Sequence, residues 1–160
     1  MNKEAKIIAC DFNNLLHTSG LVDLLNHYIM DKMGGAMPLD EKKGLQLIEG
    51  LKKHPSKLVL FAELEERLIG LAICFVNFAT FTVKPFINIH DIVVLDKYRN
   101  KGVGRNLMEG IHQAAASMGC SKITLEVRED NLNAQYLYQS LGYRECTPRM
   151  YFWEKRLTDK

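Results

Sequence analysis

The sequence lacks several features that would place it in a specialised class of protein. No apolar run reaches the roughly 18 residues that a membrane-spanning helix needs, and residues 1–6 lack the apolar core of a secretion signal. No internal repeat or low-complexity segment is found. A net charge of +2 is too small to indicate a nucleic-acid partner. These absences predict a cytoplasmic globular protein with neither a membrane nor a nucleic acid as partner.

The four cysteines do not form a recognisable set. Cys10, Cys74, Cys120 and Cys146 are far apart, and no pair has the spacing of metal ligands or of a redox motif. We therefore expect free thiols in a reducing compartment and no metal site. A chain of 160 residues, of which 47% are hydrophobic, is long enough for one domain with its own core. We accordingly assign residues 1–160 to a single domain.

Hydrophobic periodicity predicts a mixed α/β fold. Four helices are expected, at residues 15–33, 38–54, 106–118 and 131–141. Strands are expected at residues 7–10, 57–64, 67–81, 86–95 and 122–128, and a terminal hairpin is expected at 143–146 and 150–155. Two helices, a meander of strands and then alternating strands and helices are typical of a mixed sheet covered by helices.

The seven residues 99–105 (Arg-Asn-Lys-Gly-Val-Gly-Arg) join a predicted strand to a predicted helix. A glycine-rich turn at a helix N-terminus leaves backbone N–H groups without helical partners, and the helix dipole adds positive potential there. We therefore expect a phosphate-bearing ligand on the amides of residues 101–105. Lys97, Lys101 and Arg105 could simply be solvated instead, whereas Arg99 is expected to have a fixed partner.

Two common phosphate-binding turns fit this segment poorly. A P-loop needs four residues between its glycines and then Gly-Lys-Ser/Thr, which the turn lacks. A dinucleotide fingerprint matches at Gly102 and Gly104 but has Leu107 in place of the third glycine, although Glu126 stands at the distance of a ribose-binding acid. That fold also places its turn after the first strand of a βαβ unit, whereas a meander of strands precedes this one.

Two blocks of sequence together resemble the GNAT family of N-acetyltransferases. Arg99-x-x-Gly102-x-Gly104, with its approach at residues 90–98, resembles the acetyl-CoA signature of that family. Asn131-Leu132-Asn133-Ala134, followed by Tyr138 and Gly142-Tyr143, resembles a second family block, and the blocks stand in the family's order. The resemblance spans residues 68–146. It implies a GNAT fold with a mixed, mostly antiparallel sheet of about six to seven strands. Strands 86–95 and 122–128 would splay apart and leave a slot for acetyl-CoA.

The resemblance also implies the residues that bind the cofactor. The backbone of Ile92, Val93 and Val94 would hold the pantetheine arm and polarise the thioester carbonyl. The pyrophosphate would lie on the turn formed by Arg99, Asn100, Lys101, Gly102, Val103, Gly104 and Arg105. Asn131, Ala134 and Tyr138 share one helical face and would complete the cofactor site. Asn131 could bind the cofactor, cap its helix, or do both.

Two side chains are candidates for proton transfer. Tyr138 would protonate the departing thiolate as a general acid, and a packed core tyrosine is the alternative. His90 would take a proton from the acceptor amine, at a position where related enzymes often carry a glutamate that works through water. A histidine bonded within the sheet is the alternative. Strand alternation predicts that His90 faces away from Asp91, on the side of Ile92 and Val94. Asp91 could orient the base or attract a cationic substrate.

These residues predict direct acetyl transfer from acetyl-CoA to an amine in a ternary complex, since no cysteine falls within either block. The acceptor pocket is expected from residues 15–53 and from the approach at residues 78–86. We favour a small diamine-like acceptor bound through His90 and Asp91. A protein N-terminus or lysine remains an alternative acceptor, and a non-catalytic acetyl-CoA sensor remains an alternative function. Tyr151, Phe152 and Trp153 would suit either a homodimer edge, as in similar enzymes, or a monomer's core.

Overall fold

The structure is a computed structural model that describes residues 4–157. The chain divides into two compact units, Met1–Arg128 and Glu129–Lys160. The first unit contains β1 (Lys6–Ala9), α1 (Leu15–Met30), α2 (Glu41–Lys53), β2 (Lys57–Leu64), β3 (Arg67–Ala79), β4 (Lys84–Val94), the 3-10 turn η1 (Asp96–Tyr98), α3 (Val103–Ser117) and β5 (Ile123–Leu125). The second unit contains α4 (Leu132–Ser140). The assignment of the whole chain to a single domain stays a prediction.

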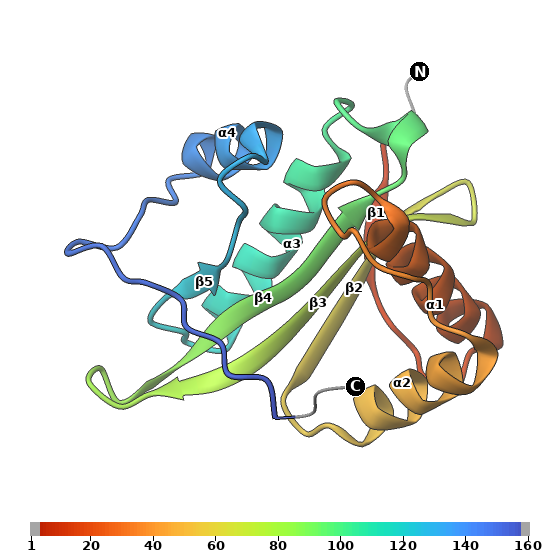
Figure 1. Cartoon of the computed structure of the whole chain (residues 1–160), viewed down its shortest axis with the longest axis horizontal. Coiled ribbons are helices and arrows are strands. Elements are labelled where there is room, and N and C mark those ends of the chain that lie inside the picture. Colours follow the sequence, from red (N-terminus) through yellow and green to blue (C-terminus); the bar gives the residue numbers. More distant parts are fainter. Residues whose placement is uncertain (1–3, 158–160) are drawn as a thin grey trace. The chain divides into compact units, whose positions relative to one another are not determined.

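The first unit is built on one five-stranded sheet in the order β1-β2-β3-β4-β5 (Figure 1). The first three pairs of strands are antiparallel, and β5 runs parallel to β4. The mixed, mostly antiparallel sheet is therefore confirmed. The expected count of six to seven strands is wrong for residues 4–157, because the terminal segments 143–146 and 150–155 form no strand. Their residues favour strands, but strand propensity yields no sheet without a partner to pair with.

Local signals in the sequence account for the boundaries of the first two helices. The side chain of Asn14 accepts a hydrogen bond from the N–H of Leu16 at 2.9 Å and begins α1. The side chain of Asp40 accepts one from the N–H of Lys43 at 2.8 Å and begins α2. Such caps satisfy N–H groups that have no partner within the helix. Among residues 4–157, no helix is long and apolar enough to cross a membrane.

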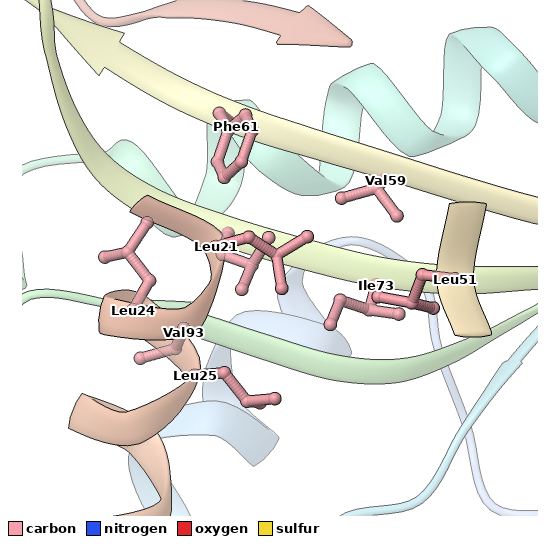
Figure 2. Close-up of a cluster of buried hydrophobic side chains, with 9 residues drawn as sticks. Leu21, Leu24, Leu25, Leu51, Val59, Phe61, Ile73 and Val93 are labelled. Carbon is pink, nitrogen blue, oxygen red and sulfur yellow. The ribbon is translucent and has the colours of Figure 1, made fainter. Parts of the chain in front are cut away.

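Helices cover both faces of the sheet. Figure 2 shows leucines of α1 and α2 directed at side chains of β2, β3 and β4. This cluster, called the α1–α2 cluster below, comprises Leu21, Leu24, Leu25, Leu51, Val59, Phe61, Leu71, Ile73 and Val93. α3 packs on the other face, where a Cβ added at Gly110 would lie 2.8 Å from Ile7. Ile7 and Ile8 are neighbours on β1 and so point to opposite faces, and Ile8 packs against the α1–α2 cluster.

Candidate active site

The glycine turn at the start of α3 has a backbone conformation that suits an anion. Asn100 and Gly102 both have positive φ, at 58° and 83°, and Gly102 caps the helix. The first N–H of α3 to reach a carbonyl of its own helix is that of Asn106, which donates to Gly102 at 3.0 Å. The N–H groups of residues 103 and 104 precede it and have no i−4 partner within the helix. A Cβ added at Gly102 would meet nothing within 4 Å, so the space beside the turn is open.

The side chain of Arg99, which begins this turn, binds three groups of the protein itself. Its Nε donates to the carbonyl of Val94 at 2.9 Å. Its Nη2 lies 3.0 Å from the carboxylate of Asp31 and 2.9 Å from that of Asp96. The expectation of a fixed partner is confirmed, and the guanidinium is neutralised by neighbouring carboxylates. The ammonium groups of Lys97 and Lys101 lie 4.9 and 5.9 Å from the ring centroid of Tyr98.

One edge of β4 is unpaired over its last residues. Pairing between β4 and β5 covers only Ile87 to Ile89 and ends where Ile89 meets Leu125. The predicted strand at 122–128 is therefore shorter than expected, with only residues 123–125 in strand conformation. Because β4 continues to Val94, five residues beyond Ile89, its side facing away from β3 is left without a strand partner in the described part of the chain.

The backbone groups on this open edge can be assigned from one hydrogen bond. The N–H of Leu95 donates to Ile69 of β3 at 3.0 Å. Backbone groups alternate in direction along a strand, so those of Val93 also point at β3, and those of Ile92 and Val94 point to the open edge. The bond from Arg99 to the Val94 carbonyl agrees with this direction. Of the three residues predicted to hold the pantetheine arm, Ile92 and Val94 are thus suitably directed.

His90 is the extra residue of a β-bulge. Ile73 of β3 pairs with Asp91, whereas the next residue, Cys74, pairs with Ile89. A bulge re-aims side chains at the point where it interrupts the ladder. The ring of His90 contacts that of Phe75, at 5.7 Å between centroids, and Phe75 packs against the α1–α2 cluster. His90 therefore lies on the face covered by α1 and α2.

Asp91 lies on the same face, so the prediction that alternation separates it from His90 is wrong. The charge of Asp91 helps to raise the pKa of Tyr28 on α1, after the larger effect of burial. Burial raises the pKa of the Asp91 carboxyl itself, and the nearby His90 opposes that shift. The bulge thus brings an exposed imidazole and a half-buried carboxyl together, beside the start of the open edge.

The second unit contains the remaining predicted residues. The side chain of Asn131 accepts a hydrogen bond from the N–H of Ala134 at 3.3 Å and caps α4, which confirms its capping role. Tyr138 is buried, and its ring lies 6.0 Å from that of Tyr143. Ala134 is partly buried one helical turn before Tyr138. Binding of the cofactor by these residues stays a prediction.

Several residues around the first unit's site were not singled out from the sequence. Tyr28 and Asp31 lie at the end of α1, while His27 contacts Asp96 of η1 at 3.2 Å. Asp96 lies in the approach to the turn, where the sequence assigns it no individual role. No short-range pattern marks these residues, because their contacts join segments about 70 positions apart. Within the described residues, no group of three or more potential metal ligands is present.

A family model described as the acetyltransferase (GNAT) family matches residues 22–143, well over half of the chain. The protein belongs to the GNAT family. It is 30% identical over 97 residues to the uncharacterized N-acetyltransferase YhfO of Bacillus subtilis, covering 61% of this chain and 64% of that protein.

A second relative is the thialysine N-epsilon-acetyltransferase of Sus scrofa. The identity is 31% over 80 residues, covering 50% of this chain and 46% of that protein. The matches therefore span about half to two thirds of the length of these relatives. The crystal structure of a probable acetyltransferase superposes with a TM-score of 0.82 at 22% identity, covering 97% of this chain and 99% of that chain. At this identity the likeness concerns the fold alone.

Proposed function

We propose that this protein transfers the acetyl group of acetyl-CoA to a small amine. The observation that carries the proposal is that one continuous segment offers two suitable surfaces in succession. The open edge at Ile92 and Val94 leads directly into the turn at residues 99–102 and the first N–H groups of α3. An extended pantetheine arm can pair with a strand edge as a peptide does, and its pyrophosphate can then lie at the helix N-terminus.

The residues present fit acetyl-CoA chemically. When bound, acetyl-CoA supplies an activated acetyl group in a thioester. The N–H groups of Ile92 and Val94 hold the arm and are donors that polarise the thioester carbonyl. Gly102 and the amides of residues 103–105 hold the phosphates. The side chain of Arg99 is already engaged with three protein groups, so its contribution is to shape the turn.

Transfer is direct, without an acetylated cysteine. Burial raises the pKa of the Cys74 thiol to about 12, and burial together with Asp11 raises that of Cys10 to about 11. Neither thiol forms an effective nucleophile near neutral pH, because the thiolate is the reactive species. The acceptor nitrogen instead attacks the carbonyl carbon, and the carbon–sulfur bond breaks. His90 accepts the proton that the amine loses, and Tyr138 donates one to the departing sulfur.

The acceptor in this proposal is a small molecule with a primary amine and a second cationic group. Asp91, half buried on the face of the sheet next to α1, supplies the negative charge that attracts such a molecule. The side-chain amine of a thialysine-like compound belongs to this class, in keeping with the name of one relative. Diamines are therefore the first acceptors to try, with aminoglycosides, lysine-containing peptides and peptide N-termini after them.

The proposal is tested by following thiol release from acetyl-CoA in the presence of this acceptor panel. Turnover with a small amine, absent without acceptor and without a stable acetyl–protein adduct, is the expected result. Tight binding of acetyl-CoA with no turnover on any acceptor would favour the sensor function instead. An acetylated protein trapped without acceptor would contradict direct transfer.

The cellular setting is also part of the proposal. All four cysteines are free thiols, which suits the reducing conditions of the cytoplasm. Tyr151, Phe152 and Trp153 are 76%, 76% and 86% exposed, and we propose that they pack in a homodimer. Light scattering of the full chain and of its Trp153→Ser variant tests this, and a monomeric wild-type protein would contradict it.

A further inference from the structure

The guanidinium of Arg99 contacts three segments that border the proposed cofactor site. Arg99 donates from Nε to the carbonyl of Val94, the last residue of β4. Its Nη2 reaches Asp96 in η1 at 2.9 Å and Asp31, the residue that follows α1, at 3.0 Å. Asp96 is shared with His27 of α1, at 3.2 Å. The open edge, the turn and the end of α1 are thus joined through a single side chain.

Asp31 is the member of this cluster that reaches beyond the cofactor turn. Its side chain is only 12% exposed. One carboxylate oxygen accepts from the N–H of Met33 at 2.9 Å, while the other faces Arg99. Its backbone carbonyl accepts from the N–H groups of Gly34 and Gly35, at 2.9 and 2.8 Å. The loop after α1 and the phosphate turn therefore share one anchoring residue.

Charge and geometry lead to opposite expectations for how removal of Asp31 affects cofactor binding. Asp31 is an acid close to the site proposed for an anionic cofactor, so by charge alone its removal would strengthen binding. By geometry its removal would weaken binding, because Arg99 would lose the partner that fixes the plane of its guanidinium. Arginine presents several donors in a rigid fork, whereas lysine presents a single flexible ammonium. Replacing Arg99 by lysine therefore keeps the charge and loses the geometry.

We propose that Asp31 is a positioning residue of the cofactor site, acting through Arg99 to hold the end of β4 and the phosphate turn in their binding geometry. The inference rests on the proposed function, since it concerns the same cofactor. It gives Asp31, an acid at the end of α1, a role in binding an anion. The lowered pKa of the Asp31 carboxyl agrees with this role, because its main causes are the Met33 N–H and Arg99.

The experiment measures the Kd of coenzyme A by calorimetry for the full chain and five variants. Asp31→Asn is expected to weaken binding about tenfold, the loss typical of a charge-assisted hydrogen bond. Arg99→Lys is expected to lose about as much although the charge is kept. Asp23→Asn removes the same charge from an exposed position on α1 and is expected to change the Kd less than about twofold. In an Arg99→Gln background, Asp31→Asn is expected to add little further loss.

Two results would overturn the proposal. One is binding to Asp31→Asn that equals or exceeds binding to Asp23→Asn, and the other is a wild-type Kd for Arg99→Lys. Circular dichroism establishes that each variant is folded, and should Asp31→Asn not fold, the Arg99→Lys result decides.

Amide hydrogen exchange without any ligand separates this proposal from the proposed function. Arg99→Lys is expected to speed exchange at residues 33–35, which Asp31 holds, relative to Asp23→Asn. Unchanged exchange there contradicts the positioning role even if coenzyme A binds. A wild-type protein that does not bind coenzyme A refutes the proposed function, while the exchange measurement still tests the link between Asp31 and Arg99.

Discussion

The rings of Phe75 and His90 meet edge to face, with their centroids 5.7 Å apart. Phe75 also contacts the ring of His54, at the end of α2, with centroids 4.7 Å apart. One phenylalanine therefore lies between two histidines, and only His90 lies at the bulge beside the open edge of β4. The pair offers a matched test of which imidazole takes part in catalysis.

His90→Gln is expected to lower kcat about a hundredfold, the lower end of the range for loss of a general base. Initial rates at saturating acetyl-CoA and acceptor measure this. His54→Gln is the control, and it should keep the wild-type kcat. An unchanged kcat in His90→Gln removes His90 from the mechanism.

Tyr138→Phe is expected to reduce kcat about a hundredfold while the Kd of coenzyme A changes little, because the variant keeps the ring and loses the hydroxyl that protonates the departing sulfur. Tyr136→Phe is the matched control, since Tyr136 is 67% exposed on the same helix. Steady-state kinetics with calorimetry separate the two effects. Equal activity in both variants would leave Tyr138 with a packing role.

Gly102→Ala is expected to destabilise the protein by about 1–2 kcal/mol, because L residues with a Cβ rarely adopt its φ of 83°. A Cβ there meets nothing within 4 Å, so the cost is conformational and not steric. Gly50→Ala, also with open space around the added Cβ but inside α2, is expected to stabilise by about 0.5–1 kcal/mol. Urea denaturation measures both. Equal effects of the two changes would contradict the strain argument.

Asp91 and Asp31 are expected to affect stability with opposite signs. Burial raises the folded-state pKa of Asp91, so the folded protein binds its proton more tightly, and stability falls as pH rises from 3.8 through that pKa. Asp91→Asn should therefore stabilise the protein at pH 7, with the gain disappearing below about pH 4. Thermal unfolding at pH 4 and pH 7 measures this. A loss of stability at pH 7 would contradict it.

For Asp31 the folded-state pKa is lowered, so its stabilising contribution is complete above 3.8 and is lost as pH falls through the lowered pKa. Asp31→Asn is expected to cost about 1–3 kcal/mol at pH 7, where its ionised carboxylate holds Arg99 and the Met33 N–H. The deficit should shrink in acid. An equal deficit at pH 7 and below pH 3 would show that charge does not contribute.

Elements with strong local signals were predicted closely from the sequence. The strand predicted at 57–64 coincides with β2, because the turn at residues 65 and 66 ends it clearly. The helix predicted at 131–141 agrees with α4 to within one residue at each end. Periodicity and end signals are properties of a single segment and can be read there.

Features that depend on distant partners were missed. Ile and Val predominate from Ile87 to Val94 and predict one continuous strand, so nothing local marks the bulge at His90, which arises from the register with β3. The expected terminal hairpin rested on the strand preference of Tyr151, Phe152 and Trp153, which decides little without a partner. The contact of Asp31 with Arg99 joins residues 68 positions apart.

The short parallel pairing of β4 with β5 leaves part of one strand edge open both to a ligand and to other chains. A sheet normally hides its hydrogen-bonding groups inside the ladder, and exposed ones invite pairing with foreign chains. Here the exposed groups are those of Ile92 and Val94, on the side of β4 that faces away from β3 and beyond the end of its pairing with β5. A ligand bound along this edge would take the place of a missing β-strand. A bound ligand would therefore protect the protein from aggregation during storage or heating, independently of any reaction that the ligand undergoes.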